Sequence, residues 1–427
     1  MSKLTLERGL EALRAQMDAP MATFFSSCVH CGLCAQACLF YTETGDPKYT
    51  PINKLEPMRR LWASEYTLWG KLKGLAGLNK PVTDELLEEW ETLVYDGCTL
   101  CGRCSMVCPV GNDISSMIRK MREGMVASGH APEDLVGASS RAVKTGSPMG
   151  LKLKALQAQI KHLQANTGLT IPIDIEGADY LVLLSSMEII NFPEYLEALA
   201  RIFKQTGLSW TLSSEAFEAT NSGVQIGSSD IARELVQRVV DGARKLRVNY
   251  VISPECGHAY TAIRWEGPNL IGQAYPFKVV HILELLDELL CSGRLKTTGM
   301  EHARLSFHDP CQIVRKGGVQ AQPVHLLNQL ADNFIPMQEH GKMNWCCGGG
   351  GGVSANERAE ELRLQVFKRK KDQLEELHLE TLVTACANCR LVMEEGLEEY
   401  NIELPIIGLT EMIADHLLED PKGNKNE

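Results

Sequence analysis

The C-terminal part of this chain is organised by one stretch, which reads His308-Asp309-Pro310-Cys311, then Trp345-Cys346-Cys347 with glycine from 348 to 352, then Cys386-Ala387-Asn388-Cys389. It holds five of the chain's 15 cysteines, in three separated segments. A tetrahedral zinc site needs only four ligands, so five thiolates from three loops favour a polynuclear iron–sulfur cluster. The glycine run lets the backbone approach inorganic sulfide closely and adopt positive φ angles. The alternatives are a zinc site and a set of ordinary buried thiols.

The order of these motifs resembles the cysteine-rich, or CCG, domain of the heterodisulfide reductase family. The resemblance implies a noncubane 4Fe-4S cluster that acts directly on disulfide sulfur. Its ligands, and the residues of the reaction, would be Cys311, Cys346, Cys347, Cys386 and Cys389.

Two side chains near Cys311 in sequence are candidates for proton transfer. His308 or Lys316 could donate a proton or stabilise a developing thiolate. The alternatives are a histidine that caps a turn and a lysine that is solvated.

The composition describes an ordinary soluble globular protein, with 44% hydrophobic and 23% charged residues in 427. The net charge of −11 argues against nucleic acid as the main partner. The sequence has neither a secretory signal nor an apolar run long enough to span a bilayer. We therefore predict a cytoplasmic protein, or one held at the cytoplasmic membrane face through a partner subunit. Clustered cysteines in such a chain indicate metal ligands rather than disulfides.

Two further cysteine motifs lie in the N-terminal part. Both have the C-x2-C-x2-C-x3-C spacing of bacterial ferredoxins, in which the fourth cysteine ligates the other cluster. We therefore predict two cubane 4Fe-4S clusters, one held by Cys28, Cys31, Cys34 and Cys108 and the other by Cys98, Cys101, Cys104 and Cys38. The long insertion between the motifs contains two predicted helices, 57–69 and 84–95. With them the module resembles the helical ferredoxin domain found in heterodisulfide reductases.

Hydrophobic patterns place the remaining elements. Amphipathic helices are predicted at 1–20 and 151–166, and a further helix at 114–128. After residue 177 short apolar strands alternate with helices, which is typical of parallel α/β units. The predicted strands are 180–184, 250–252, 304–307 and 382–384, and the predicted helices are 193–207, 279–290, 323–330 and 357–377.

The α/β part reads as a repeat. Ser213-Ser214 and Ser253-Pro254-Glu255-Cys256 are spaced like Cys346-Cys347 and the Cys386–Cys389 motif, and Ser185 or Ser186 would match Cys311. A serine hydroxyl is harder to deprotonate than a thiol, so the first copy should keep the fold without a cluster. Cys256 and His258 supply too few ligands for a metal. Cys291 is predicted to be a buried apolar thiol.

The predicted fold class is α+β multidomain: a helical ferredoxin domain with two 4Fe-4S clusters, then two repeated α/β CCG domains, the first degenerate. The predicted boundaries are 1–130 for the ferredoxin-like domain, 131–176 for a helical linker, 177–300 for the degenerate CCG domain, 301–418 for the CCG domain with the noncubane cluster, and 419–427 for a disordered tail.

This arrangement resembles the fused catalytic subunit of heterodisulfide reductases, and in particular the reductase-like subunits of membrane redox complexes in sulfur-metabolising bacteria. The resemblance implies two-electron disulfide reduction or thiol oxidation, with a disulfide or thiol, carried by a small molecule or a small protein, as substrate. It implies a membrane partner that bears quinone or cytochrome. No nucleotide-binding glycine fingerprint is present, so flavin and NAD are not expected on this chain.

Two other functions remain open. The chain could be the electron-relay subunit of a flavoprotein dehydrogenase of glycolate, lactate or glycerol-3-phosphate type that passes electrons to quinone. It could also be a scaffold whose clusters only stabilise the fold. The sequence does not specify the substrate, the direction of electron flow, the partner stoichiometry, or any role of Cys256 and Cys291.

Overall fold

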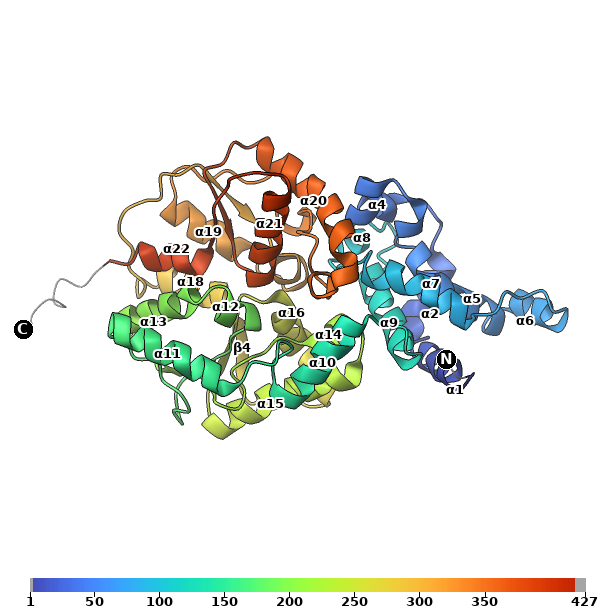
Figure 1. Ribbon diagram of the computed structural model, residues 1–427, viewed down its shortest axis with the longest axis horizontal. Helices are drawn as coiled ribbons and strands as arrows, with labels where there is room; N and C mark the ends of the chain where they lie inside the picture. The colour runs from blue at the N-terminus through green and yellow to red at the C-terminus, as the bar shows by residue number, and fades with distance from the viewer. Residues whose placement is uncertain (1–2, 419–427) are drawn as a thin grey trace, which may run out of the picture.

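The computed structural model describes residues 3–418, and the predicted disordered tail, 419–427, lies outside the described residues. The N-terminal part is helical, and the C-terminal part is α/β with two parallel sheets (Figure 1). The protein is therefore a mixed helical and sheet structure, as predicted.

The N-terminal part is built from helices that pack around α9. α1 and α7 both lie against α9, and the core between them is apolar. The bounds are α1 Lys3–Ala15, α2 Ala19–Ser27, α3 Leu33–Gln36, α4 Leu39–Thr44, η1 Pro47–Tyr49, η2 Asn53–Leu55, α5 Glu56–Glu65, α6 Leu68–Leu75, α7 Asp84–Tyr95, α8 Arg103–Met106 and α9 Ile114–Ala127. The helices predicted at 84–95 and 114–128 are confirmed.

The helix predicted at 57–69 is in fact two helices. α5 ends at Glu65, and α6 begins at Leu68 after the new N-cap Thr67. The Thr67 hydroxyl accepts a hydrogen bond from the Gly70 amide at 2.9 Å, which favours a fresh helix start over a continuous helix. The predicted helix at 1–20 is likewise divided, because Asp18 caps α2.

The first sheet has the strand order β2-β1-β3-β4, with every pair parallel. Its strands are β1 Tyr180–Val182, β2 Trp210–Thr211, β3 Tyr250–Ser253 and β4 Lys278–His281. The helices around it are α10 Glu133–Thr145, α11 Leu153–Thr167, α12 Ser186–Ile190, α13 Glu194–Thr206, α14 Ser222–Ile226, α15 Ser229–Leu246, α16 Gly257–Tyr260, η3 Thr261–Glu266, α17 Gly267–Ile271 and α18 Ile282–Cys291.

The helix predicted at 279–290 begins three residues later than expected, because Lys278–His281 forms β4 beside β3. Two adjacent valines favour an extended backbone there. His281 and Glu284 then form a capping box that starts α18 at Ile282.

The second sheet has the order β5-β6-β7 and is also parallel. The prediction of parallel α/β units is therefore confirmed for both sheets. The bounds are β5 Leu305–His308, η4 Gln312–Lys316, α19 Ala321–Leu330, η5 Gly341–Met343, η6 Val353–Ala355, η7 Glu357–Ala359, α20 Glu360–Glu375, β6 Thr381–Thr384, α21 Ala387–Glu399, β7 Ile406–Gly408 and α22 Leu409–Asp415.

One hydrophobic core runs through both sheets, and α13 of the first packs on α22 of the second. This packing therefore fixes the two sheets relative to each other, together with the edges at which their strands end. Within residues 3–418, no helix is both long and apolar enough to cross a bilayer.

Candidate iron–sulfur site

The loops that follow the strands of the second sheet bring the C-terminal cysteines together. Cys311 directly precedes η4 after β5, and Cys386 is the N-cap of α21 after β6. The carboxyl ends of neighbouring parallel strands meet at one edge of a sheet, which is where α/β proteins commonly bind ligands. The loop that carries Cys346 and Cys347 folds over this edge. All five predicted ligands are buried.

These five side chains form one contiguous set. The sulfurs of Cys347 and Cys389 lie 3.4 Å apart. Cys386 hydrogen-bonds to Cys389, and Cys346 hydrogen-bonds to both Cys311 and Cys347. The structure thus gathers the donor set that a sulfur-bound metal cluster requires.

Sharing of protons among these thiols favours thiolates at some of them. Hydrogen bonding from Cys346, and then from Cys389, lowers the pKa of Cys347 well below its ordinary value. A hydrogen bond from Cys389 likewise lowers the pKa of Cys386. Thiolate, not thiol, is the form that binds metal, so the site is chemically suited to a cluster.

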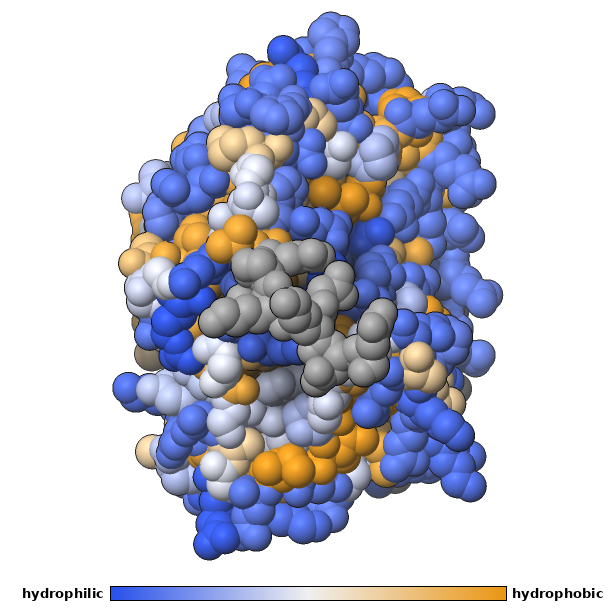
Figure 2. Space-filling view, turned by 90° about the vertical axis from the view of Figure 1, so that its left-hand side faces the viewer, coloured by the Kyte–Doolittle hydropathy of each residue, from blue (hydrophilic) through white to orange (hydrophobic). Residues whose placement is uncertain are grey.

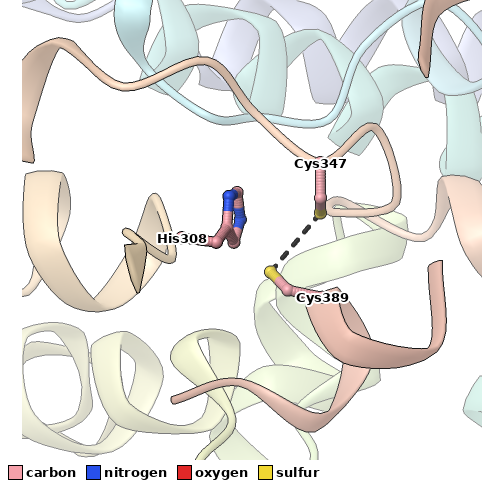
Figure 3. A group of neighbouring side chains, drawn as sticks. All are labelled: His308, Cys347 and Cys389. Atoms are coloured by element: carbon pink, nitrogen blue, oxygen red, sulfur yellow. Dashed lines mark hydrogen bonds between the residues drawn. The ribbon is translucent and has the colours of Figure 1, made fainter. Parts of the chain in front are cut away.

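His308 completes the site from the end of β5. A ring nitrogen of His308 and the sulfurs of Cys347 and Cys389 all lie within 4.8 Å of one another (Figure 3). His308 is only 1% exposed, and neither ring nitrogen has a hydrogen-bond partner among residues 3–418. Burial lowers its pKa well below the ordinary value, so the ring is neutral. An unpaired buried polar group costs about 1–3 kcal/mol, which a bound group at this position would offset.

A pocket of about 700 Å³ opens over the cysteines. The second sheet contributes Cys311, Cys347, Cys386 and Cys389 to its wall. The first sheet contributes the facing wall, which includes Ser185, Ser186, Thr220, Cys256 and His258. The pocket therefore lies between the two α/β parts.

The facing wall corrects part of the predicted repeat. Ser213 does not line the pocket but packs against Gly242 of α15, and Thr220 stands on the pocket wall. Spacing along the chain misplaced the serines because the segment after β2 is irregular. Ser185 is the N-cap of α12 and lines the pocket, in agreement with the predicted match to Cys311.

Cys256 is buried and is the N-cap of α16, as Cys386 is the N-cap of α21. By its position at the start of a helix Cys256 corresponds to Cys386, whereas the spacing along the chain aligned Cys256 with Cys389. The neighbouring His258 already accepts a hydrogen bond from the Gly351 amide at 3.2 Å. This contact occupies the Nε2 atom of His258.

Two other side chains lie away from the pocket. Cys291 is exposed at the end of α18, so the prediction of a buried thiol is wrong. Its sulfur lies 3.9 Å from His325 of α19. Lys316 lies against Gly102 in the N-terminal part. Burial has the larger influence on the pKa of Asp113 and raises it, whereas the charge of Lys316 lowers it. The backbone amide of Lys316 donates to the Cys311 carbonyl at 3.1 Å, but its side chain extends toward the N-terminal part.

The first predicted cubane set lines a small cavity of its own, which contains Cys28, Cys31, Cys34 and Cys108 and none of the other cysteines. The two ferredoxin motifs also share one backbone shape. His30 and Leu100 have φ of 54° and 53°, and Gly32 and Gly102 have φ of 82° and 81°. The cavity places Cys108 beside the first three cysteines of the other motif, as the predicted crossed assignment requires.

The second set gathers around a buried lysine. The ammonium of Lys54 lies 3.5 Å from the sulfur of Cys38. Burial would lower the pKa of Lys54, but the neighbouring thiols of Cys38, Cys98 and Cys104 raise it. Lys54 therefore stays charged and balances thiolate charge.

The second set touches the C-terminal cysteines directly. Cys101 hydrogen-bonds to Cys346, whose sulfur also lies 3.4 Å from the Thr99 hydroxyl. Gly351 approaches so closely that a Cβ there would lie 2.8 Å from the Thr99 carbonyl carbon. Gln312 donates to the Leu100 carbonyl at 2.9 Å. The glycine run thus allows two cysteine-bearing loops to meet.

Sequence reasoning missed Lys370 of α20. This lysine is 1% exposed. Burial lowers its pKa to about 8, whereas Asp309, and after it the thiols of Cys347, Cys346 and Cys389, raise it. The segment around it is so charged that it looks solvated. The available signal was helical spacing, since Val366, Phe367 and Leu374 share its face.

Comparisons with known proteins match both cysteine-bearing parts of the chain. Residues 25–112 match the 4Fe-4S dicluster domain, and residues 305–394 match the cysteine-rich domain named CCG. The Hdr-like menaquinol oxidoreductase iron-sulfur subunit of Archaeoglobus profundus is 26% identical over 95% of this chain and 81% of its own length. A subunit of the dihydromethanophenazine:CoB–CoM heterodisulfide reductase of Methanosarcina barkeri is 26% identical over 92% of this chain and 93% of its own length.

Two more distant matches add context. The EtfAB:quinone oxidoreductase of Syntrophomonas wolfei is 26% identical over 88% of this chain and 56% of its own length. A hypothetical protein of solved structure from Helicobacter pylori shares the fold at a TM-score of 0.51 and 12% identity, over 83% of this chain and 66% of its own. The predicted resemblance is confirmed: the chain carries both domains and is similar to iron–sulfur electron-transfer subunits of heterodisulfide reductase-like complexes.

Proposed function

We propose that this chain is the catalytic subunit of a heterodisulfide reductase-like complex. It would reduce a disulfide, or oxidise two thiols, at a noncubane 4Fe-4S cluster held by Cys311, Cys346, Cys347, Cys386 and Cys389. The observation that carries the proposal is the convergence of these five buried cysteines beside a pocket of about 700 Å³.

The reaction balances with two electrons and two protons. Reduction breaks the S–S bond of the disulfide and gives two thiols, and the electrons come from a partner redox subunit. When bound, the clusters would supply one-electron transfer, and the noncubane cluster would supply the site of disulfide chemistry. The same steps in reverse would oxidise thiols.

The chain's own residues would prepare the pocket for developing thiolate charge. The neutral ring of His308 can donate one N–H to a sulfur at the position where Cys347 and Cys389 approach it. Lys370 supplies a nearby positive charge. Lys316 lies elsewhere, so we leave it out of the proposed reaction.

The three cysteine sets differ in their access to solvent. Cys31 is exposed, and its surroundings include the exposed apolar residues Val29, Leu33 and Val110. Such a rim suits a redox partner that donates or accepts electrons. The Cys98 set is largely buried and contacts Cys346 through Cys101. This order favours electron exchange at the first set and disulfide chemistry at the last.

Iron content gives the simplest test. Two cubane clusters and one noncubane cluster require roughly 12 irons per chain. Anaerobic purification followed by iron and acid-labile sulfide assays measures this directly. Roughly eight irons, with five free thiols in the C-terminal set, would contradict the proposal.

Substitutions separate the sets. Cys347→Ser should remove the noncubane signal and leave both cubanes reducible, whereas Cys104→Ser should damage one cubane and spare the noncubane signal. Cys291→Ser, at an exposed cysteine, is the control. Oxidation of the protein with a thiol present should give a paramagnetic state whose spectrum broadens when the thiol carries sulfur-33.

A second candidate is an electron relay from a flavoprotein dehydrogenase to quinone. It is favoured by the similarity to the EtfAB:quinone oxidoreductase. Fast quinone reduction with a flavoprotein partner, together with no thiol-dependent signal, would support the relay and exclude disulfide chemistry.

A further inference from the structure

α6 and the loop that follows it, residues 66–80, form a projection that we call the α6 finger. It extends from the N-terminal part at the end of the molecule opposite α13 and α22 (Figure 1). Five large apolar side chains stand exposed on it: Leu68 82%, Trp69 77%, Leu72 56%, Leu75 88% and Leu78 71%. The opposite end of the molecule is mostly hydrophilic, with its hydrophobic residues in separate patches (Figure 2).

The exposed apolar face has a fixed direction. Gly70 is buried, and a Cβ there would lie 1.6 Å from the Ala63 carbonyl oxygen of α5, so this side of α6 faces the protein. Asn79 donates to the Gly70 carbonyl at 2.9 Å and ties the returning loop to the same side. At helical spacing Leu68, Leu72 and Leu75 then share the outward face.

Positive charge flanks the apolar face. Lys71 and Lys73 lie on either side of the arc formed by the leucines and Trp69, as helical spacing requires. Lys80 follows in the loop, and residues 66–80 contain no Asp or Glu. The preceding acid, Glu65, pairs with Arg14 at 2.8 Å. The finger is therefore basic on a chain whose net charge is −11.

We propose that the α6 finger lies in the surface of a bilayer that contains anionic lipid. A helix with leucine and tryptophan on one face and lysines at its edges buries the apolar face at the level of the headgroups while the lysines reach the phosphates. Anionic lipid is the occupant of matching chemistry, because each lysine near such a surface is attracted to it. Only this finger would enter the bilayer, and the inference does not depend on the proposed reaction.

Vesicle co-sedimentation of the full, cluster-loaded chain tests the proposal. We expect binding to phosphatidylglycerol/phosphatidylcholine vesicles that weakens as salt is raised, and at most slight binding to phosphatidylcholine alone. Leu72→Glu with Leu75→Glu should weaken binding about tenfold or more, because the apolar contact is lost. Ile175→Glu changes an exposed apolar residue far from the finger and should bind like the native chain.

A second variant tests the role of charge. Lys71→Glu with Lys73→Glu keeps the apolar arc but should abolish the preference for anionic vesicles. Unchanged iron content in each variant shows that the fold is retained. The proposal is wrong if the native chain ignores anionic vesicles, or if the leucine variants bind them as well as the Ile175 variant does. The proposal would also be overturned, in favour of a protein partner, if the leucine variants bound vesicles like the native chain but no longer bound an integral membrane protein.

Discussion

Lys54 and Lys370 are each 1% exposed, and each lies beside a set of cysteines. Lys54 also donates to the Gly97 carbonyl at 2.5 Å, and Lys370 donates to Gln373 at 2.8 Å. A buried ammonium is costly unless it is paired. The opposing charge comes from Cys38, Cys98 and Cys104 at Lys54, and from Asp309 and then the C-terminal cysteines at Lys370. Lys54 thus supports a thiolate-rich site by an observation that is independent of the cysteine spacing.

Lys370→Met removes one of these charges and keeps a similar side-chain shape. The reduced, more negative state of a bound cluster would lose stabilisation, so its midpoint potential should fall by about 60 mV, or about 1.4 kcal/mol for a one-electron couple. Potentiometric titration followed by paramagnetic resonance measures the shift. Lys368→Met, at an exposed lysine paired with Asp372, should leave the potential unchanged.

A group of buried carboxylic acids lies near Cys386. Burial raises the pKa of Glu188 to about 8 and that of Glu411 to about 7, and it raises the pKa of Glu255 well above its ordinary value. Glu188 accepts from the Glu255 amide at 2.7 Å, and Thr410 donates to Glu255 at 2.6 Å. Glu188 is therefore mostly protonated in the folded state at neutral pH, whereas Glu411, which also accepts from Arg390 at 3.3 Å, is protonated below about pH 7.

Glu411→Gln should reduce the loss of stability at rising pH. The pKa of Glu411 is raised in the folded state, so between about pH 4.5 and pH 7 the unfolded chain releases its proton first and the folded state loses stability. Glutamine does not ionise, so the variant should escape up to about 3 kcal/mol of this loss.

Unfolding midpoints across this pH range, at a fixed heating rate, give the measurement. Glu403→Gln, at an exposed carboxylate, should follow the native pH dependence. Parallel curves for the native chain and the Glu411 variant would contradict the assignment.

The glycine loop at 348–352 is the element that joins the two cysteine-bearing parts. Gly348, Gly351 and Gly352 have φ of 101°, 63° and 89°, which other residues adopt only with strain. Gly351 also needs space, because its neighbour is the backbone of Thr99 rather than a movable side chain. The loop is therefore specified both by conformation and by contact.

Gly351→Ala should separate this loop from the segment that carries Cys98 and Thr99. The variant carries the strain of a positive φ, about 1–2 kcal/mol, and also a clash with the Thr99 backbone. We expect a lower unfolding midpoint and slower reduction of the C-terminal cluster by the cubanes in rapid-mixing experiments. Gly293→Ala has a similar φ of 70° but open space around the new Cβ, so it should show the strain alone.

Arg122 links three regions of the whole molecule. Its fully buried guanidinium donates to the carbonyls of Val94 at 2.7 Å, Cys98 at 2.7 Å and Gly351 at 2.6 Å, and also to that of Gln225. These acceptors lie in the helical part, in the glycine loop and beside the first sheet. One side chain therefore holds both walls of the pocket to the helical part.

Arg122→Met should destabilise the assembly by more than about 4 kcal/mol, since it leaves several buried carbonyls unpaired at about 1–3 kcal/mol each. Guanidinium unfolding, followed by loss of the iron–sulfur absorption, measures this. Arg59→Met, at an exposed arginine paired with Glu56, should have little effect. Equal midpoints for the two variants would show that Arg122 does not hold the parts together.

The sequence by itself indicated the cysteine motifs, because the spacing within each motif is local. It also determined the helices at 84–95 and 114–128, whose caps and apolar faces agree, and the alternation of strands and helices in the α/β part. It placed Ser213 wrongly, because spacing in an irregular segment does not specify which side of a sheet a residue occupies.

Only the tertiary structure decided which sets touch and which polar groups lie between them. The contact of Cys346 with Thr99 joins residues 247 positions apart, and no local pattern encodes such a contact. The burial of Lys370 and the unpaired ring of His308 likewise depend on loops that meet only in the folded chain. Packing at the edges of the two sheets therefore brought the second cysteine set into contact with the C-terminal cysteines.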